Sequence, residues 1–432
     1  MQTFRLTFVS ILCAFWCVSA PASDRNGALD WSKLPAEAKA RIVQLAKLTA
    51  SDGLSGDSFG FSVAISENVI VVGIRRAAAY VFVKPASGWQ DMTQTAKLTD
   101  SSGLQDSFGY SVAISGNIIV VGAPFANQGQ GVAYAFVKPA EGWHDMTQTA
   151  TLVASDGTPG DHFGESVSVS GDVAIVGAFE ATVNGNPYQG AAYVYTQPAM
   201  ESANANAVTL TETAKLTASD GAEVSFFGGA VSISGNTVAV GAQDGNGGTG
   251  EAYVFVQPQS GWTNMTETAE LKPSDDGGQL GASIATNGST VVAGAPSAGS
   301  SRRVKGAAYV FVEPASGWTN MTETAQLQAS TELGPLGSSV AVDATGQDIL
   351  AGSPTGYGNR DNSGQVCVFV QPPGGWLTTS KDNLTLFSSD GQFEDYFGFS
   401  ISLSGQTLLV GAYGAEIGSN PGQGAAYVFG EQ

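Results

Sequence analysis

One hairpin pattern recurs along the whole chain and restricts what the chain can fold into. Residues 106–124 read DSFGYSVAISGNIIVVGAP, and residues 57–73 and 395–412 are close copies. Each copy begins with a Phe-Gly pair or a Leu-Gly pair, and the seven pairs are Phe59-Gly60, Phe108-Gly109, Phe163-Gly164, Phe227-Gly228, Leu280-Gly281, Leu336-Gly337 and Phe397-Gly398. Their spacings run from 49 to 64 residues. A period of this length that tolerates insertions predicts a repeat protein with variable loops.

Each copy contains four short strand-like runs, here called A to D in chain order. In the second copy they are 110–114, 118–121, 132–137 and 149–153, and Gly116-Asn117 makes a tight turn between A and B. Run B is continuously apolar, which indicates burial on both faces. Seven such units predict an all-β fold, a seven-bladed β-propeller of four-stranded antiparallel blades, because a ring buries both faces of each blade. The alternative is a linear β-solenoid, for which this period is long.

The two ends of the repeat array predict how the ring closes. The last copy stops at run C, residues 425–429, while residues 43–50 read VQLAKLTA, a run D with no blade before it. We therefore expect the N-terminal strand to complete blade seven, since a bare seventh blade would expose an open sheet edge.

The first 22 residues are predicted to be a secretory signal peptide. Residues 6–18, LTFVSILCAFWCV, are apolar but too short to span a bilayer, and Ala20-Pro21-Ala22 offers a small-residue cleavage pattern. An uncleaved anchor is the alternative. We expect a secreted protein, extracellular or periplasmic, without a membrane span after cleavage. Residues 23–41 form an N-terminal extension in which a short helix is expected after Pro35, and residues 42–432 form the propeller.

The net charge argues against a nucleic-acid partner, and the cysteine content argues against a disulfide. The formal net charge is -20, and binding to nucleic acid needs clustered Lys and Arg, so no nucleic-acid partner is expected. Cys13 and Cys17 belong to the predicted signal peptide, which leaves Cys367 without a disulfide partner. Cys367 stands in run C where other copies have Tyr134 or Tyr309, and we expect a buried apolar filler there.

The pattern FG-x-S-V-A, then VGAP, then GAAYVF resembles the FG-GAP repeat, the unit of the integrin α-chain N-terminal β-propeller. Gly122-Ala123-Pro124 and Gly294-Ala295-Pro296 are literal Gly-Ala-Pro triplets, and the resemblance covers residues 42–432. It implies a propeller fold and adhesion-like or scaffold roles, although the fold hosts several functions. Integrin-like blades often carry a calcium loop between A and B. Here that connection has only two residues, such as Ser115-Gly116, too few to surround a calcium ion.

The sequence offers little for catalysis. His144 and His162 are the only histidines, and each replaces a residue that varies among the copies and is expected to be exposed. We expect no histidine metal site, no catalytic triad, no enzyme activity and no cofactor. The Asp-Gly loops are the one place where the sequence could provide a calcium site. Asp52, Asp156 and Asp390 are each followed five residues later by a second aspartate. Such loops either bind a cation weakly or only stabilise a turn.

Two sets of loop residues are candidates for binding. The B–C loops carry all the arginines beyond residue 41, and together with a lysine the candidate ligand-binding residues are Arg75, Arg76, Arg302, Arg303, Lys305 and Arg360. With the aromatic residues of the same loops they could contact a carboxylated protein or glycan. On the opposite face, the C–D loops carry Trp89, Trp143, Trp262, Trp318 and Trp376, read as structural plugs or as a lectin-like ring.

We therefore expect a secreted or cell-surface binding or scaffold propeller without catalytic activity, whose partner is an extracellular protein or a glycan. A carbohydrate-binding, lectin-like propeller is the alternative, and an enzyme is the least favoured class.

Overall fold

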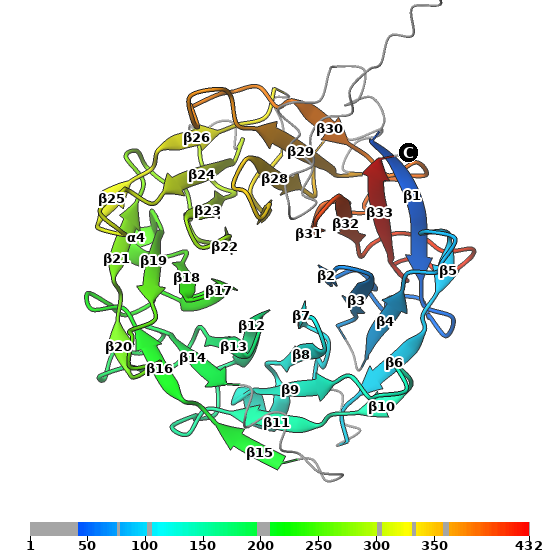
Figure 1. Ribbon diagram of the computed structural model, residues 1–432, viewed down its shortest axis with the longest axis horizontal. Coiled ribbons are helices and arrows are strands. Elements are labelled where there is room, and N and C mark those ends of the chain that lie inside the picture. Colours follow the sequence, from blue (N-terminus) through cyan, green and yellow to red (C-terminus); the bar gives the residue numbers. More distant parts are fainter. Residues whose placement is uncertain are drawn as a thin grey trace, which may run out of the picture.

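A computed structural model shows seven β-sheets arranged as blades around a central axis (Figure 1). It describes residues 42–431 apart from 76–77, 102–105, 197–207, 300–304, 331–333 and 357–362. The expected seven-bladed propeller is confirmed. The predicted signal peptide and the N-terminal extension lie outside the described residues.

Blades are numbered one to seven in the order of the Phe-Gly or Leu-Gly pairs. The innermost strands, A, are β2 (Ser62–Ser66), β7 (Ser111–Ser115), β12 (Phe163–Ser170), β17 (Phe227–Ser234), β22 (Ser283–Thr286), β27 (Ser339–Val342) and β31 (Ser400–Ser404). The B strands are β3 (Val69–Gly73), β8 (Ile118–Ala123), β13 (Val173–Ala178), β18 (Thr237–Ala242), β23 (Thr290–Ala295), β28 (Asp348–Ser353) and β32 (Thr407–Ala412).

The C strands are β4 (Ala79–Val83), β9 (Val132–Val137), β14 (Ala191–Thr196), β19 (Glu251–Val256), β24 (Ala307–Val312), β29 (Gln365–Val370) and β33 (Ala425–Glu431). The D strands are β6 (Ala96–Thr99), β11 (Ala150–Val153), β16 (Ala214–Thr217), β21 (Ala269–Lys272), β26 (Ala325–Leu327), β30 (Leu384–Leu386) and, for blade seven, β1 (Ile42–Thr49). Two one-turn helices, α2 (Ala126–Gly129) and α4 (Gly245–Gly248), lie in B–C loops.

The hairpin pattern has the predicted register. In blade two, β7 and β8 pair from Ser111↔Gly122 to Ser115↔Ile118, with Gly116-Asn117 as the turn. All six residues of β8 are buried, because B strands lie in the middle of each sheet and are packed on both faces by the neighbouring blades.

Two glycines form each contact between neighbouring blades near the axis, and a serine supports most of these contacts. In blade two, an added Cβ on Gly122 would lie 2.0 Å from the carbonyl oxygen of Gly164, the second residue of the next Phe-Gly pair. The Ser111 hydroxyl donates to the same carbonyl at 2.8 Å. The glycine contact recurs at all seven junctions and the serine bond at six. The recurring glycines and serines of the repeat are therefore the residues that pack one blade on the next.

The ring closes through the N-terminal strand, as expected. Strand β1 pairs with β33 in antiparallel register from Ile42↔Glu431 to Leu48↔Ala426, with a bulge between Gln44 and Ala46. At the inner end of the same junction, the Ser400 hydroxyl of blade seven donates to Gly60 of blade one at 2.8 Å. First and last blades therefore lie side by side, and the linear solenoid is wrong (Figure 1).

The blades carry one element that the sequence analysis missed. Five of the seven sheets have a fifth, outermost strand, which the C–D loop of the next blade supplies in parallel orientation. These strands are β5 (Met92–Thr93), β10 (Met146–Thr147), β15 (Val208–Thr211), β20 (Met265–Thr266) and β25 (Met321–Thr322). We call such a segment a clip. Four of the five clips are a two-residue Met-Thr segment, which is too short to be recognised as a strand from periodicity.

Candidate interaction surface

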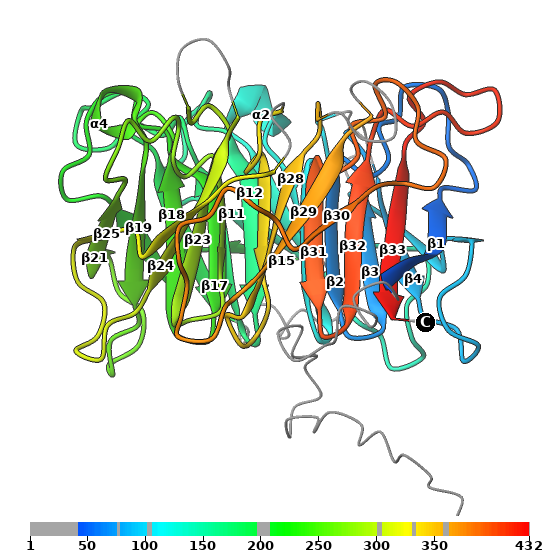
Figure 2. The same cartoon turned by 90° about the horizontal axis from the view of Figure 1, so that it is seen from above.

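The B–C and D–A loops lie on one face of the ring, as expected from the alternation of strands. Neighbouring loops are bonded through their backbones: His162 of a D–A loop donates to Gly129 of a B–C loop at 2.8 Å, and Phe226 donates to Tyr188 at 3.1 Å. The two rims of the ring are seen from the side in Figure 2. We call the rim with these loops the B–C face.

A continuous row of aromatic rings crosses the B–C face over blades seven, one, two, three and four. Successive ring centroids are 4.7 to 6.3 Å apart. In order, the rings belong to Tyr396, Tyr413, Phe399, Phe61, Tyr110, Phe125, His162, Phe179, Phe226 and Tyr188. We call this row the aromatic crescent.

Three repeat positions supply nearly all of the crescent. They are the residue before the Phe-Gly pair, the residue after it, and a residue that follows the Gly-Ala of strand B. Blades five and six have non-aromatic residues at these positions, Gln279, Ala282 and Pro296 in blade five and Pro335, Ser338 and Pro354 in blade six. The row therefore covers one side of the ring and ends at blade four.

Exposed apolar side chains accompany the crescent. Phe125 is 48% exposed and Tyr188 46%, and the D–A loops of blades one, four and seven add exposed Leu54, Val224 and Phe393. The sixth exposed large hydrophobic residue in the described chain, Leu377, lies in a C–D loop. Clustered exposed apolar surface on a soluble domain marks an interaction site more often than scattered residues do.

Charged groups lie beside the inner rings of the crescent. The Arg75 guanidinium lies over the ring of Phe61 at 5.0 Å, a cation–π contact. Burial raises the pKa of Glu165 to about 7, helped by the charge of Glu180 and opposed by the Tyr110 hydrogen bond and by Arg75. Burial and Glu165 also raise the pKa of Tyr110. The crescent thus combines apolar rings with one cation and one carboxyl group that titrates near neutral pH.

His162 is not the exposed side chain that was expected. Its Nδ1 is 3.0 Å from Glu180 Oε2, and its ring packs between Phe125 and Phe179, with centroids at 5.1 and 5.6 Å. Its backbone φ is 54°, a left-handed conformation shared by Ser58, Ser107 and Tyr396 in the same slot. This backbone turns the side chain over the face, which residue type alone could not reveal. His144 is exposed, as expected.

Replacing Glu165 by glutamine should remove a pH dependence of stability. Because the folded pKa is about 7 and the ordinary value 4.5, the folded state holds the proton more tightly, and stability falls as pH rises from about 4.5 through 7. We expect a loss of up to about 3 kcal/mol over this range in the parent chain and a flatter profile in Glu165→Gln. Denaturation midpoints from pH 5 to 8 measure it. Glu223→Gln, an exposed change on the same face, is the control and should keep the parent slope.

The candidate binding residues are only partly described. Arg76, Arg302, Arg303 and Arg360 lie outside the described residues. Arg75 and Lys305 lie in the B–C loops of blades one and five, which are not neighbours in the ring. Of these two, Arg75 contacts the aromatic crescent.

The tryptophans of the C–D loops are buried, which agrees with the prediction that they are structural plugs. Their side chains are 4 to 8% exposed. The Nε1 groups of Trp318 and Trp376 donate to the backbone of Gly288 and Gly346, at 3.2 and 2.9 Å. These five buried rings cannot form the exposed lectin-like ring considered from the sequence.

The first aspartate of the Asp-Gly loops binds protein groups that the sequence analysis did not pair with it. In blade one, Asp52 accepts from Tyr80 Oη at 2.9 Å and from Lys97 Nζ at 2.5 Å. The same triad recurs as Tyr193, Asp156 and Lys215 and as Tyr427, Asp390 and Lys47. Burial raises the pKa of each aspartate, but the lysine and tyrosine bonds outweigh it, and the pKa values are lowered.

The second aspartate stabilises the turn, as the turn interpretation held. Asp57, Asp161 and Asp395 each accept a backbone N–H three residues earlier at 2.7 Å, from Leu54, Thr158 and Gln392. Both carboxylates of each of these loops therefore have protein partners.

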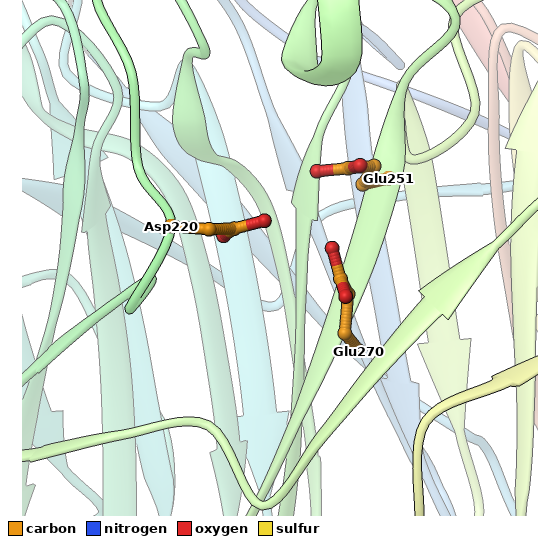
Figure 3. A group of neighbouring side chains, drawn as sticks. All are labelled: Asp220, Glu251 and Glu270. Atoms are coloured by element: carbon orange, nitrogen blue, oxygen red, sulfur yellow. The ribbon is translucent and has the colours of Figure 1, made fainter.

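Blade four has a cluster of acidic residues that the sequence analysis missed. Carboxylate oxygens of Asp220, Glu251 and Glu270 lie within 4.8 Å of one another (Figure 3). Glu251 replaces the alanine that begins strand C in several blades, and Glu270 replaces the lysine of the triad. Those two departures from the repeat are the sequence features from which the acidic cluster could have been predicted.

This cluster has a cation of its own. Lys272 Nζ lies 2.5 Å from Glu270 and 3.3 Å from Glu251, and Tyr253 donates to Glu251 at 2.6 Å. Burial and the charges of Asp220 and Glu251 raise the pKa of Glu270 against the opposing Lys272 bond. Three carboxylates are the donor type that a divalent cation prefers, and the Lys272 ammonium group is paired with two of them, Glu251 and Glu270.

Calcium should change the stability of this protein little. We expect millimolar calcium, after removal of metals by a chelator, to shift the melting temperature by less than about 1 °C, because the loop carboxylates have protein partners. Differential scanning calorimetry with and without calcium measures it. A larger, saturable shift would contradict this expectation, and its loss in Glu251→Gln would assign the ion to blade four.

Comparison with known families agrees with this geometry. A family profile described as the FG-GAP repeat matches residues 42–87, 92–136, 146–195, 210–255 and 382–429, more than half of the chain. The fold and these matches define a repeat propeller of the protein-binding kind. The chain belongs to the FG-GAP repeat family. A search of curated proteins found no match. Within the described part of the chain, neither short helix approaches the length and apolar character that crossing a bilayer requires.

Proposed function

We propose that this protein is a secreted or cell-surface binding propeller that recognises an extracellular protein through the aromatic crescent. The observation that carries the proposal is the unbroken row of rings over five blades, of which Phe125 and Tyr188 are exposed. Aromatic side chains are enriched at protein interfaces because they bury a large area at a low cost in conformational entropy. Propellers of this family are typically non-catalytic binding domains.

Arg75 gives the surface a directional contact. Its guanidinium lies over the ring of Phe61 within the crescent of an acidic protein, where it can pair with a carboxylate of the partner. We expect Arg76, the next residue in the sequence, to contact the partner as well. The predicted signal peptide supports a location outside the cell.

The test uses two variants of opposite faces. The chain and the double variant Phe125→Ser/Tyr188→Ser are immobilised and exposed to surface proteins of the source organism, with cross-linking and mass spectrometry. We expect the double variant to bind the captured partner at least tenfold more weakly, as for aromatic hot spots. Leu377→Ser, which removes an even more exposed apolar side chain from the opposite rim, should bind like the parent. Equal binding by all three proteins would refute the proposed surface.

A glycan partner is the second candidate. The crescent places tyrosine hydroxyls and Arg75 beside ring faces, and sugars combine stacking on aromatic rings with hydrogen bonds. A glycan array tests this candidate. Saturable binding to a glycan that Phe125→Ser/Tyr188→Ser abolishes would favour a glycan over a protein partner.

A further inference from the structure

Blades three and seven share one kind of B–C loop. Residues 179–190 and 413–424 both end in Asn-Pro-x-Gln-Gly, a pattern that occurs nowhere else in the sequence. Each loop has a tight turn at its tip, closed by two backbone hydrogen bonds of 2.9 to 3.2 Å. The paired residues are Val183 with Asn186 in blade three and Ile417 with Asn420 in blade seven. The repeat therefore builds the same local structure twice, on two separate blades.

The asparagine of this pattern fixes the loop on the body of the ring. Asn186 Nδ2 donates to Gln189 Oε1 at 3.1 Å and to the backbone carbonyl of Gly221 at 3.0 Å, and Gln189 is buried. The corresponding residues in blade seven are Asn420, Gln423 and Gly53, with bonds of 3.0 and 3.4 Å. A loop held in this way is ordered in advance, which lowers the entropy cost of binding a ligand against it.

Each loop forms one wall of a pocket at the outer edge of its blade. The pocket volume is about 580 Å³ in blade three and about 530 Å³ in blade seven. The floor is the D strand, β16 or β1, and the second wall is the clip, β20 or β5, all on the outside of the ring (Figure 1). Corresponding lining residues are Asp156, Lys215, Val183, Met265 and Thr266 in blade three and Asp390, Lys47, Ile417, Met92 and Thr93 in blade seven.

An ion pair lies in each pocket with bonding capacity to spare. Lys215 Nζ is 2.6 Å from Asp156 Oδ2, Lys47 Nζ is 2.5 Å from Asp390 Oδ2, and all four side chains are partly exposed. An ammonium group has three N–H donors and each carboxylate oxygen has two lone pairs, so both partners can also bond to a ligand. The pair therefore offers a donor and an acceptor side by side.

The charges of the pockets favour a neutral ligand. Asp156 and Lys215 are the charged residues among those that line the blade-three pocket, and their charges cancel, so an ion bound there would have no opposite charge to compensate it. The blade-seven pocket adds Asp91 and Glu416, which disfavour an anion.

The arrangement of polar and apolar groups favours a sugar. Adjacent hydroxyls of a sugar ring can donate to the aspartate and accept from the lysine, because each hydroxyl is both a donor and an acceptor. The apolar side chains of Val183 and Met265, or of Ile417 and Met92, can then contact the C–H groups of the ring.

Blade one has the ion pair without the loop. Asp52, Tyr80 and Lys97 form the same triad there, and β10 supplies the same clip. Its B–C loop consists only of residues 74–78, which are too few to form the walling turn. Blade one is therefore a natural control for the two pockets.

We propose that blades three and seven each bind a neutral saccharide in this pocket, with adjacent hydroxyls on the lysine–aspartate pair and the C–H groups of the ring against the loop and the clip. The pockets share no residue with the aromatic crescent, so these sites are independent of the partner proposed for that surface.

Methyl NMR of the chain from Ser23 onward, labelled at methionine, tests each pocket separately. Glucose, galactose, mannose, N-acetylglucosamine, maltose and lactose are added in turn at millimolar concentration. With at least one of these sugars, we expect saturable shifts of the Met265 and Met92 signals, since both side chains line the pockets. Met146 and Met321 occupy the same clip position beside blades one and four, which lack the loop, and their signals should not move.

Lysine variants assign the contacts. Lys215→Ala should weaken the binding reported by Met265 at least tenfold, as expected for the loss of a charged hydrogen bond, and should leave the binding reported by Met92 unchanged. Lys47→Ala should have the reverse effect. Lys97→Ala is the matched control in blade one and should change neither. Parent-like positions of the Met146 and Met321 signals verify that each variant is folded.

Three results would overturn the proposal. The first is the absence of a saturable shift of Met265 and Met92 with every sugar of the panel. The second is unchanged sugar affinity in both Lys215→Ala and Lys47→Ala. The third is loss of sugar binding in Phe125→Ser, which would assign the sugar to the aromatic crescent instead. A protein partner that binds the crescent without any sugar effect on Met265 or Met92 would refute these sites alone.

Discussion

Replacement of Leu48 by alanine is expected to lower the free energy of unfolding by about 2–5 kcal/mol, the range of large-to-small changes in a packed core. Leu48 is fully buried, and β1 packs in one apolar cluster with Phe59 and Ile70 of blade one and Leu409 of blade seven. The cavity would therefore open at the junction where the two ends of the array meet.

Lys47 supplies the control, since it is the preceding residue of the same strand. Lys47→Ala removes a lysine that is paired with Asp390 at a part-exposed site, and such pairs contribute about 0–1 kcal/mol. Guanidinium denaturation of the parent and both variants measures the difference. Similar destabilisation by the two changes would mean that the closing strand is not specifically coupled to the core.

Replacement of Gly241 by alanine should be nearly as damaging, although it adds only one methyl group. An added Cβ would lie 2.0 Å from the Gly281 carbonyl oxygen of the next blade, and the other near atoms are also backbone. The two blades would have to separate, at a cost of about 3 kcal/mol.

Gly229 in the same blade is the matched control. Its backbone has no left-handed φ, and the nearest atom to an added Cβ is 3.4 Å away, so the methyl group fits. Gly229→Ala should be neutral or stabilise by up to about 1 kcal/mol, because it reduces the freedom of the unfolded chain. If Gly241→Ala had the same midpoint as Gly229→Ala, the close approach of the blades would not constrain the fold.

Most of the fold could be predicted because the repeat presents the same local information seven times. The paired apolar runs, the two-residue turn at Gly116-Asn117 and the stray D-type run at residues 43–50 each define an element or its place in the ring. The clips could not be predicted in this way, since a two-residue strand such as Met92–Thr93 has no periodicity of its own.

The candidate site was predicted less completely. The B–C face and Arg75 follow from loop order and composition, but the aromatic crescent joins residues from three unrelated repeat positions in five blades. The pairing of Lys47 with Asp390 and the shifted pKa of Glu165 likewise depend on neighbours from distant parts of the chain.

The sequence alone therefore determined the number of blades, the order of strands within each blade and the closure of the ring, because those depend on short-range alternation and on the count of copies. Tertiary structure decided which side chains meet. Strand A of every blade converges on one axis, and this brings Phe61, Tyr110 and Phe399 into one row although 338 residues separate the first from the last along the chain. The pairing of strands C and D likewise brings three carboxylates and one lysine together in blade four, because inter-strand register, not sequence spacing, sets their distances.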